Sequence, residues 1–432
     1  MADQISSLKT GIKYKKTPIG KIPVDWEVAR LKKIATAFYN GGTPDTTNKN
    51  YWNGSIPWIT GADFENQKVK PIRRYITPDG VKNSATNVIP KGNLLIVTRT
   101  GVGKLAIAPF DIAISQDITG VILDSQKASP EFIYWYLDFI SSKLKSTIQG
   151  TSINGLLRAD LEEIDLPLPI VSEQKIIAQI LTTLDEVIDK TSQIIEKTKV
   201  AKKGLMQKLL TRGIDYKKFK KTEIGEIPIE WEVMRLKDVC AEIYRYPTYY
   251  NIEYVEQGSG VPEIRGELIK NNGELSNNLS EYRYISKETS LKFPRTILHE
   301  GDFVLSVRGT MGKIGFIPSY LENSNMTANL MRISPNHEKV YPPWMKQFLI
   351  SDFFQSRLHA ASSATTIKTI KAPELKQIEL ALPPFREQKK IADILSSADE
   401  KIEKETRHKE QLESLKKGLM QVLLTGKVRV SV

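Results

Sequence analysis

Two short segments of the sequence place arginine and lysine around a glycine turn. They are Thr98-Arg-Thr-Gly-Val-Gly-Lys104 and Val307-Arg-Gly-Thr-Met-Gly-Lys313. Exposed backbone N–H groups in such a turn can approach a phosphate closely, and arginine can hold O6 and N7 of guanine with two hydrogen bonds. The candidate DNA-binding residues of these turns are Arg99, Thr100, Lys104, Arg308, Thr310 and Lys313. The alternative is a plain hairpin turn with solvated charges.

A second pair of segments shares a frame of proline, isoleucine and glycine but carries different side chains at a fixed point within it. Ile56-Pro-Trp-Ile-Thr-Gly61 carries Thr60 where Val261-Pro-Glu-Ile-Arg-Gly266 carries Arg265. Different base preferences would require such an exchange at a fixed point, so both residues are candidates for DNA binding.

A third pair follows two tyrosines. Tyr39 precedes Asn-Gly-Gly-Thr-Pro44, whereas Tyr244 precedes Arg245-Tyr-Pro-Thr-Tyr-Tyr250. Tyrosine and arginine together suit contacts with sugar, phosphate and base edges, which makes Tyr244 and Arg245 candidates as well. A tyrosine cluster that is partly core is the alternative.

The usual catalytic sets are not recognisable. All four histidines lie in the second half of the chain without metal-ligand spacing, and a single cysteine excludes an internal disulfide and a cysteine-based zinc site. The phosphate-loop motif fails because Thr98 and Leu105 stand where Gly and Ser or Thr are required. The Pro-Pro pairs at Pro342 and Pro383 lack the first residue of a base-methyltransferase turn, and Glu374-Leu-Lys376 lacks the upstream Pro-Asp of a nuclease site. We therefore expect no catalytic residue and no metal site.

Length, charge and the distribution of apolar residues indicate the broad class of protein. The 432 residues predict two to four domains at about 100–200 residues each. With 62 Lys+Arg against 50 Asp+Glu, the formal charge of +12 favours a polyanionic partner such as nucleic acid. No apolar run approaches the ~20 residues of a membrane span, and the first residues lack the apolar core of a signal peptide. We expect a cytoplasmic protein.

The chain consists of one unit of about 210 residues written twice. The opening Gly11–Lys16, followed by Thr17–Trp26, returns as Gly213–Lys218 followed by Thr222–Trp231. Residues 173–211 align without a gap to residues 387–425 and are identical at 21 of 39 positions. The middles have diverged, so the ends of the unit stay alike while the middle differs.

The closing segment of each copy predicts a long helix. In the first copy, apolar residues at a/d spacing are Ile177, Leu181, Leu184, Ile188, Ile195, Leu205 and Leu209. About 39 residues at 1.5 Å each span about 58 Å. Two such helices would bury their seams on each other as an antiparallel coiled coil; a helix packed only on its own domain is the alternative. The centres of both seams are polar.

The middles predict α/β or mainly antiparallel β structure. Residues 93–97 with 105–108, and residues 302–306 with 314–317, each have the pattern of a hairpin. Residues 130–140 and 342–354 look like amphipathic helices that belong to the core. We therefore predict an α/β (α+β) fold with four parts: recognition domains at 1–165 and 214–379, and long helices at 166–213 and 380–432.

This order of parts resembles the DNA-specificity subunit of type I restriction-modification systems. The resemblance covers essentially the whole chain. It is carried by Ile164-Asp-Leu-Pro-Leu-Pro169 with Glu173-Gln174, by the segment from Ile378 to Gln388, by the paired GLMQ-LLT helix ends, and by Thr17–Trp26 with its echo.

The resemblance implies that each variable region is a target-recognition domain that reads one half of a split DNA site. The helices then fix the gap and dock two methyltransferase (M) subunits, and a restriction/translocase (R) subunit joins for cleavage. The resemblance also implies that the complex methylates N6 of adenine. No cofactor is expected on this chain, whereas S-adenosylmethionine is expected on the M subunit and ATP with Mg on the restriction partner. The residues expected at the subunit interface are Glu173, Gln174, Glu387 and Gln388.

Three consequences follow for the two copies. Because their middles share few residues, the target should be asymmetric, with a non-specific spacer. Half-sites one helical turn apart, ~34–36 Å, are within reach of the helices. The echo of Gly11–Lys16 places the start of the chain near the end of the second helix. A self-contained methyltransferase or nuclease, and an RNA-binding or scaffold protein, are the alternatives.

Overall fold

The two halves of the repeat fold as separate units, and both ends of the chain contribute to the first. The computed structural model describes residues 13–65, 68–99, 101–148, 156, 158–245, 252–308, 310–362 and 369–431. Unit 1 combines Met1–Thr191 with His408–Val432, and unit 2 is Ser192–Arg407.

Unit 1 contains two four-stranded sheets. The first has the order β11-β10-β13-β4 and the second the order β8-β5-β12-β9. The strands of the first sheet are β4 (Ala35–Asn40), β10 (Leu94–Val97), β11 (Leu105–Ile107) and β13 (Ile118–Leu123). Those of the second are β5 (Trp52–Ile59), β8 (Tyr75–Ile76), β9 (Asn87–Ile89) and β12 (Ile112–Ile114).

Smaller elements complete unit 1. Its two-stranded ribbons are β1 (Tyr14–Thr17) with β2 (Gly20–Pro23), β3 (Glu27–Arg30) with β14 (Asp165–Leu168), and β6 (Phe64–Glu65) with β7 (Lys68–Val69). The helices are α2 (Leu31–Ile34), α3 (Pro78–Lys82), α4 (Pro130–Ile148) and α5 (Arg158–Glu162), with 3-10 turns η1 (Lys49–Tyr51) and η2 (Gly61–Asp63).

Unit 2 repeats this plan. Its first sheet has the order β18-β26-β23-β24, formed by β18 (Cys240–Arg245), β23 (Phe303–Ser306), β24 (Ile314–Phe316) and β26 (Leu330–Pro335). The second has five strands in the order β19-β21-β20-β25-β22. They are β19 (Tyr254–Val255), β20 (Val261–Ile264), β21 (Arg283–Ile285), β22 (Ile297–Leu298) and β25 (Ser324–Met326).

The remaining ribbons of unit 2 have counterparts in unit 1, whereas its 3-10 turns are more numerous among the described residues. Two ribbons pair β15 (Phe219–Thr222) with β16 (Gly225–Pro228) and β17 (Glu232–Arg235) with β27 (Glu379–Leu382). The helices are α7 (Leu236–Val239), α8 (Lys287–Lys292), α9 (Pro342–Ile350), α10 (Asp352–Ala361) and α11 (Ala372–Lys376). The 3-10 turns are η3 (Gly266–Leu268), η4 (Leu279–Glu281), η5 (Pro294–Thr296) and η6 (Ser319–Leu321).

The second sheet of each unit contains one parallel strand pair. Trp58 of β5 lies opposite Ala113 of β12, and Glu263 of β20 lies opposite Asn325 of β25. The other strand pairs within these sheets are antiparallel. With helices packed beside the sheets, this confirms the mixed α/β fold and the internal repeat.

The predicted hairpins are present, and both helices predicted in the middles are wrong in their extent: the one predicted at 130–140 continues to Ile148 as α4, and the other is divided in two. β10 pairs with β11, and β23 pairs with β24, as antiparallel neighbours. The segment 342–354, which we expected as one helix, breaks at Ser351 into α9 and α10. The cause is local, because the Ser351 hydroxyl accepts a hydrogen bond from the Phe354 amide (3.3 Å) and so caps a new helix.

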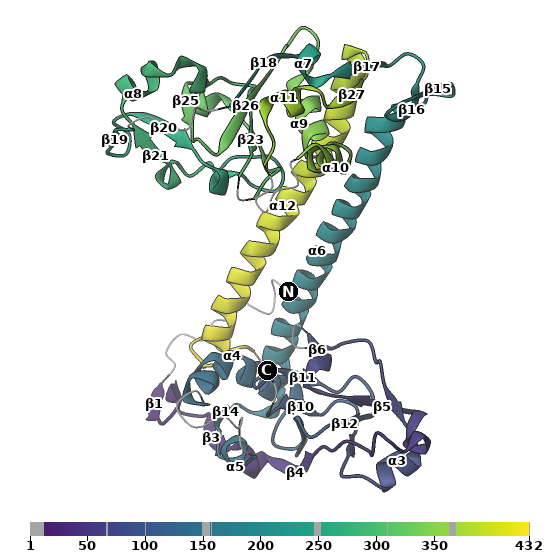
Figure 1. The fold of residues 1–432 in the computed structure, drawn as a ribbon. Coiled ribbons are helices and arrows are strands. Elements are labelled where there is room, and N and C mark those ends of the chain that lie inside the picture. The colour runs from purple at the N-terminus through teal and green to yellow at the C-terminus, as the bar shows by residue number, and fades with distance from the viewer. Residues whose placement is uncertain are drawn as a thin grey trace. The chain divides into compact units, whose positions relative to one another are not determined.

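The two long helices, α6 (Val171–Arg212) and α12 (Phe385–Leu423), pack antiparallel, as predicted (Figure 1). Each begins in one unit and ends in the other. One half of each helix therefore belongs to the core of each unit.

The seam of α6 differs from the prediction at one position. Ile177, Ile188 and Ile195 are buried, but Leu205 is 40% exposed. Steps of seven from Ile188 lead to Lys202, and steps of seven from Leu184 lead to Leu205, so both residues stand at a/d positions. Of the two, Lys202 is buried in the seam and Leu205 is not.

An ion pair joins the two long helices within each unit. In unit 2 the Lys202 ammonium lies 2.6 Å from Asp399, and in unit 1 that of Lys416 lies 2.5 Å from Asp185. Both pairs are largely shielded from solvent. Because 202 aligns with 416 and 185 with 399, the same ion pair occurs twice under the internal repeat.

In unit 1, strand β1 contacts the segment that follows α12. The Tyr14 hydroxyl lies 3.4 Å from the carbonyl oxygen of Gly426. Gly426 has a φ of +68°, and a Cβ there would lie 2.4 Å from Pro23. Only glycine fits this contact. The predicted proximity to the end of the second helix is confirmed at Tyr14, within the part of this segment that the structure describes.

No helix among the residues that the structure describes is long and apolar enough to cross a membrane.

Candidate nucleic-acid interface

The two arginine turns lie at corresponding places in the two units. Arg99 follows β10 and Arg308 follows β23, and both side chains are exposed. None of the ion pairs or side-chain hydrogen bonds found in the described parts of the chain involves either guanidinium. Gly101, Gly103 and Gly312 have φ near +90°, which keeps the turns tight. Thr310 is exposed as well, whereas Thr100 lies outside the described residues.

The lysine of each turn reaches back to the neighbouring segment. The Lys104 ammonium donates to the carbonyl of Gly61 (3.2 Å), and that of Lys313 to the carbonyl of Ile269 (3.5 Å). The structure thus brings Lys104 beside Thr60, two candidates that are 44 positions apart. These hydrogen bonds join each arginine turn to the 3-10 turn that follows a strand of the second sheet, η2 after β5 and η3 after β20.

Tyr244 and Arg245 lie at the end of β18. Arg245 pairs in register with Met331 of β26, whose neighbour Leu330 pairs with Ser306, just before the Arg308 turn. Arg245 and the Arg308 turn therefore emerge at the same end of the sheet. Tyr244 is half-buried, and the guanidinium of Arg295 lies 4.0 Å from its ring centroid.

Thr60 and Arg265 occupy the same place in η2 and η3 as N-caps. Thr60 donates from its hydroxyl to the carboxylate of Asp63 (2.9 Å). Arg265 is mostly buried, forms an ion pair with Glu267 and donates to the carbonyl of Glu281 (2.7 Å). The exchange seen in the sequence thus changes the local hydrogen bonding.

Sequence reasoning missed Asp63 and the two arginines bound to it. Asp63 is 3% exposed and accepts hydrogen bonds from both Arg73 and Arg74. The spacing Thr60-x-x-Asp63 is that of a capping box, which signals a helix start. It gives no sign of the arginines, which lie ten and eleven positions later.

The four expected subunit-interface residues are buried within their own units. Glu173 and Gln174 are 0% exposed, and Glu387 and Gln388 are 8% and 1% exposed. The Trp26 indole donates to Glu173 (3.2 Å), and that of Trp231 to Glu387 (2.9 Å). Their role toward another subunit stays a prediction.

The glutamate partners differ between the units. In unit 1 Arg429 forms an ion pair with Glu173 (2.6 Å). In unit 2 the hydroxyl of Tyr216 and the amide of Ile214 donate to Glu387, at 2.8 and 2.9 Å. Burial and the hydrogen bond to Glu387 raise the pKa of Tyr216, so its hydroxyl remains a donor at neutral pH.

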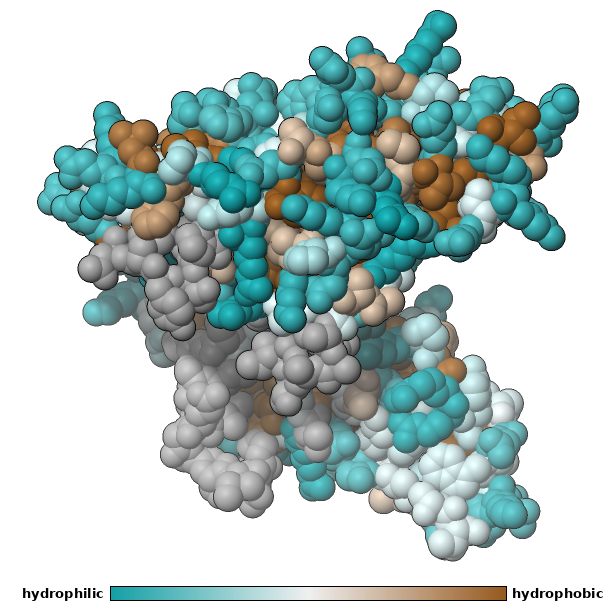
Figure 2. Space-filling model, turned by 45° about the horizontal axis from the view of Figure 1, so that its top comes forward, coloured by the Kyte–Doolittle hydropathy of each residue, from teal (hydrophilic) through white to brown (hydrophobic). Residues whose placement is uncertain are grey.

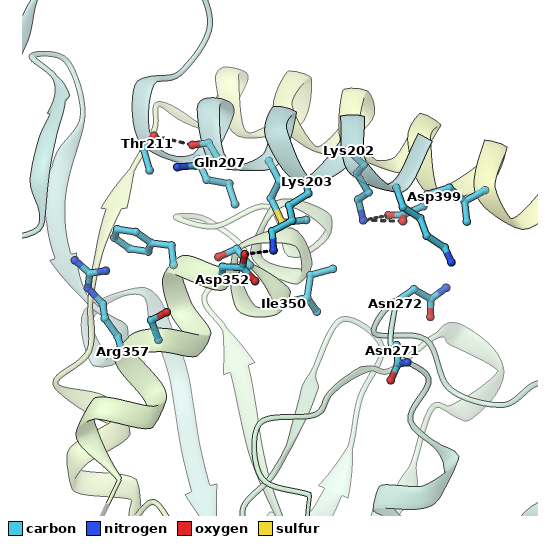
Figure 3. A pocket seen from close by; sticks show the side chains of 17 residues that line it. Lys202, Lys203, Gln207, Thr211, Asn271, Asn272, Ile350, Asp352, Arg357 and Asp399 are labelled. Atoms are coloured by element: carbon cyan, nitrogen blue, oxygen red, sulfur yellow. Dashed lines mark hydrogen bonds and ion pairs between the residues drawn. The ribbon is translucent and has the colours of Figure 1, made fainter. Parts of the chain in front are cut away.

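A cavity of about 680 Å³ lies in unit 2 between α6, α10, α12 and the Asn271–Asn272 turn (Figure 3). The cations that line it are engaged with protein groups. Lys202 pairs with Asp399 and Lys203 with Asp352. Lys199 lies 3.7 Å from Glu196, and Arg357 donates to the carbonyl of Ile224 (3.4 Å). We therefore assign this cavity no ligand.

The face shown in Figure 2 and the titratable groups of the described residues indicate no other chemistry. Apolar residues appear in Figure 2 as separate patches in a mostly hydrophilic face, which is ordinary for a folded protein. Among the described residues, no group of histidine, cysteine and carboxylate side chains could hold a metal ion. Burial raises the pKa of the Cys240 thiol, which disfavours the reactive thiolate.

The chain matches a known protein family. The type I restriction modification DNA specificity domain matches the chain twice, over residues 23–199 and 228–414. The chain belongs to this family. The resemblance noted in the sequence is confirmed, and both copies of the repeat are specificity domains.

Curated relatives of the specificity family match along nearly their whole length. The chain is 31% identical over 419 residues to the type I restriction enzyme MjaVIII specificity subunit of Methanocaldococcus jannaschii, covering 95% of this chain and 94% of the relative. It is also 31% identical over 434 residues to the putative MjaX specificity subunit of the same organism, covering 96% and 97%.

Solved specificity subunits share the fold. The S subunit from M. genitalium gives a TM-score of 0.60 at 14% identity, with 96% of this chain and 97% of that chain covered. A chain from a study of type I complex assembly gives 0.56 at 17% identity, covering 94% and 99%. This chain is thus a DNA specificity subunit of a type I restriction-modification enzyme, and is itself non-catalytic.

Proposed function

We propose that each unit reads one half of an asymmetric, bipartite site in double-stranded DNA. The observation that carries the proposal is the repeated arginine turn: Arg99 and Arg308 are exposed at the same end of equivalent sheets. The flanking candidates differ between the units, since Thr60 stands where Arg265 does. Two units with equivalent sheets but different side chains at the same positions are suited to two half-sites of different sequence.

We also propose that α6 and α12 set the spacer and dock methyltransferase subunits, with a restriction/translocase subunit as a further partner. A 42-residue helix is about 63 Å long, which exceeds one turn of DNA at ~34–36 Å. S-adenosylmethionine, ATP and Mg would then be bound by those partners. In this scheme the chain divides into 1–165, 166–213, 214–379 and 380–432, and acts in the cytoplasm.

The test of the bipartite site is to sequence methylated adenines in a host that carries this chain and its methyltransferase partner. A motif with two unlike specified parts separated by a fixed gap is expected. A continuous motif, or none, would contradict the proposal. The purified chain alone should transfer no methyl group from S-adenosylmethionine to DNA, and should prefer split-site duplex DNA over structured RNA.

The turn arginines give a residue-level prediction. Arg99→Ala and Arg308→Ala should each weaken DNA binding through their own half-site, by ~1–3 kcal/mol if the arginine reads a base. Binding to duplexes altered in one half-site at a time measures this. Lys91→Ala is the matched control, because Lys91 is exposed before β10, at the opposite end of that strand from Arg99. Normal folding with unchanged affinity in both arginine variants would leave the turns as plain hairpins.

A further inference from the structure

Unit 1 holds two arginines on one buried carboxylate. One oxygen of Asp63 accepts from Nε of Arg73 (2.9 Å), and the other accepts from Nη2 of Arg74 (2.9 Å) and from the amide of Thr60 (2.8 Å). Although burial raises the pKa of Asp63, hydrogen bonds from Thr60, Arg73 and Arg74 outweigh it and hold the pKa below its usual value. The carboxylate therefore stays ionised and the cluster stays intact at neutral pH.

The two guanidinium groups are fixed yet accessible. The side chain of Arg73 is 61% exposed and that of Arg74 is 38% exposed, whereas that of Asp63 is 4% exposed. Arg74 also lies 4.6 Å from the ring centroid of Trp58, a buried residue whose indole donates to the Gly42 carbonyl (3.1 Å). A carboxylate on one edge and a ring on one face together determine how Arg74 is oriented.

The cluster adjoins the candidate interface. Lys104, from the Arg99 turn, binds the carbonyl of Gly61, the first residue of η2, and Asp63 is the last residue of the same turn. The Asp63 cluster and the arginine turn are therefore neighbours on unit 1.

Unit 2 has a related arrangement built from other residues. Arg283 aligns with Arg74, and its guanidinium lies 5.9 Å from the ring centroid of Tyr254. The carboxylate there is Glu263, 2% exposed, which accepts a hydrogen bond from Tyr254 (3.4 Å) and attracts Arg265 and Arg283. A buried carboxylate and a ring thus accompany the aligned arginine in both units, whereas the geometry differs.

We infer that Asp63 is a positioning residue that presents Arg73 and Arg74 to a guanine-containing base pair of the first half-site. This inference rests on the proposed function and adds the residues that determine specificity in unit 1. It extends beyond the turn arginines, because Arg73 and Arg74 come from the segment before β8.

The arrangement suits a base better than a phosphate. A buried carboxylate 2.9 Å away offsets part of the charge that attracts a phosphate. It takes Nε and one N–H of Nη2 of Arg73, so the fork that Arg73 can present to a base is the one formed by Nη1 and the second N–H of Nη2. Reading O6 and N7 of guanine needs that fork in a fixed orientation, which neighbouring groups must hold.

The test compares methylated motifs in a host that carries the chain and its cognate methyltransferase subunit. Arg73→Lys and Arg74→Lys keep the charge but lose the fork. At least one of them should make one base pair of the first half-site degenerate, with discrimination reduced about tenfold or more. The second half-site should be unchanged. Asp63→Asn should relax the same position, and Glu65→Gln, a nearby exposed carboxylate, should change nothing.

Each other outcome has a definite meaning. If the Lys variants kept the motif, and Ala variants of the same arginines lowered the salt dependence of duplex binding by about one ion without changing the motif, the arginines would be phosphate contacts and the inference would be wrong. An Asp63→Asn chain that melts earlier and methylates all sites less, with base preference unchanged, would show a merely structural role and also overturn it. If the unaltered chain gave no bipartite motif, the proposed function itself would fail.

Discussion

Arg429→Ala should destabilise unit 1 by about 3–5 kcal/mol, because it leaves a buried carboxylate without its cation. The Glu173 side chain is 0% exposed and accepts from Nε and Nη2 of Arg429 at 2.6 and 2.8 Å. Its remaining donor is the indole of Trp26, at 3.2 Å. The hydrogen bonds to Glu173 raise the pKa of Arg429, so the cation persists at any pH at which the fold does.

Urea unfolding combined with amide hydrogen exchange measures this effect and assigns it to a unit. Protection should fall in unit 1 and stay unchanged in unit 2. Arg407→Ala is the control, because Arg407 makes only an exposed pair with Glu403 one turn away, and such pairs contribute about 0.3–0.5 kcal/mol. Adding Glu173→Gln to Arg429→Ala should recover part of the stability. A single variant that unfolds at the same urea concentration as the unaltered chain would contradict the assignment.

Gln388→Ala should destabilise unit 2 by ~1–3 kcal/mol, since the buried carbonyl of Pro383 and two part-buried backbone groups would lose their partner. The side-chain oxygen of Gln388 accepts from the amide of Tyr341 (2.8 Å). Its nitrogen donates to the carbonyls of Lys339 and Pro383, at 3.0 and 2.9 Å. The side chain thus ties the start of α12 to the segments before α9 and α12.

Gln174→Ala provides the matched variant in unit 1. Gln174 accepts from the Ser129 amide (2.8 Å) and donates to the carbonyls of Lys127 and Pro169. Each variant should reduce the unfolding free energy of its own unit alone, as followed by hydrogen exchange, and Gln179→Ala on the exposed face of α6 should have little effect. If Gln388→Ala left stability intact but weakened binding of the methyltransferase subunit, the residue would be a subunit contact, as the family resemblance predicts.

Elements that depend on local pattern could be predicted from the sequence. The long helices follow from apolar spacing, and the hairpins follow from short apolar runs around glycine turns. The break at Ser351 could have been predicted too, because serine before aspartate is a common helix start. The exposure of Leu205 could not, since Lys202 and Leu205 both stand at a/d positions, and which of them is buried depends on the partner helix, where Asp399 meets Lys202.

Contacts between distant residues could not be predicted. Glu173 and Arg429 are 256 positions apart. The repeated Glu-Gln pair at 173–174 and 387–388 resembled a shared binding motif, because the neighbouring sequence does not show which groups these side chains contact. Asp63 was missed because a capping pattern accounts for it without the arginines. Conversely, Lys104 and Thr60 were both identified, although their proximity through Gly61 emerged only in three dimensions.

The closure of unit 1 by both ends of the chain reverses the usual order of maturation on the ribosome. Domains generally fold as they emerge, the N-terminal one first. Here the core of unit 1 includes Met420, Leu423 and Leu424, and its buried Glu173 needs Arg429, whereas unit 2 is complete once Arg407 has been made. Unit 2 can therefore mature while unit 1 still waits for its last segment. A chain that ended before Arg429 would have all residues of unit 2, whereas unit 1 would lack the cation that pairs with its buried Glu173.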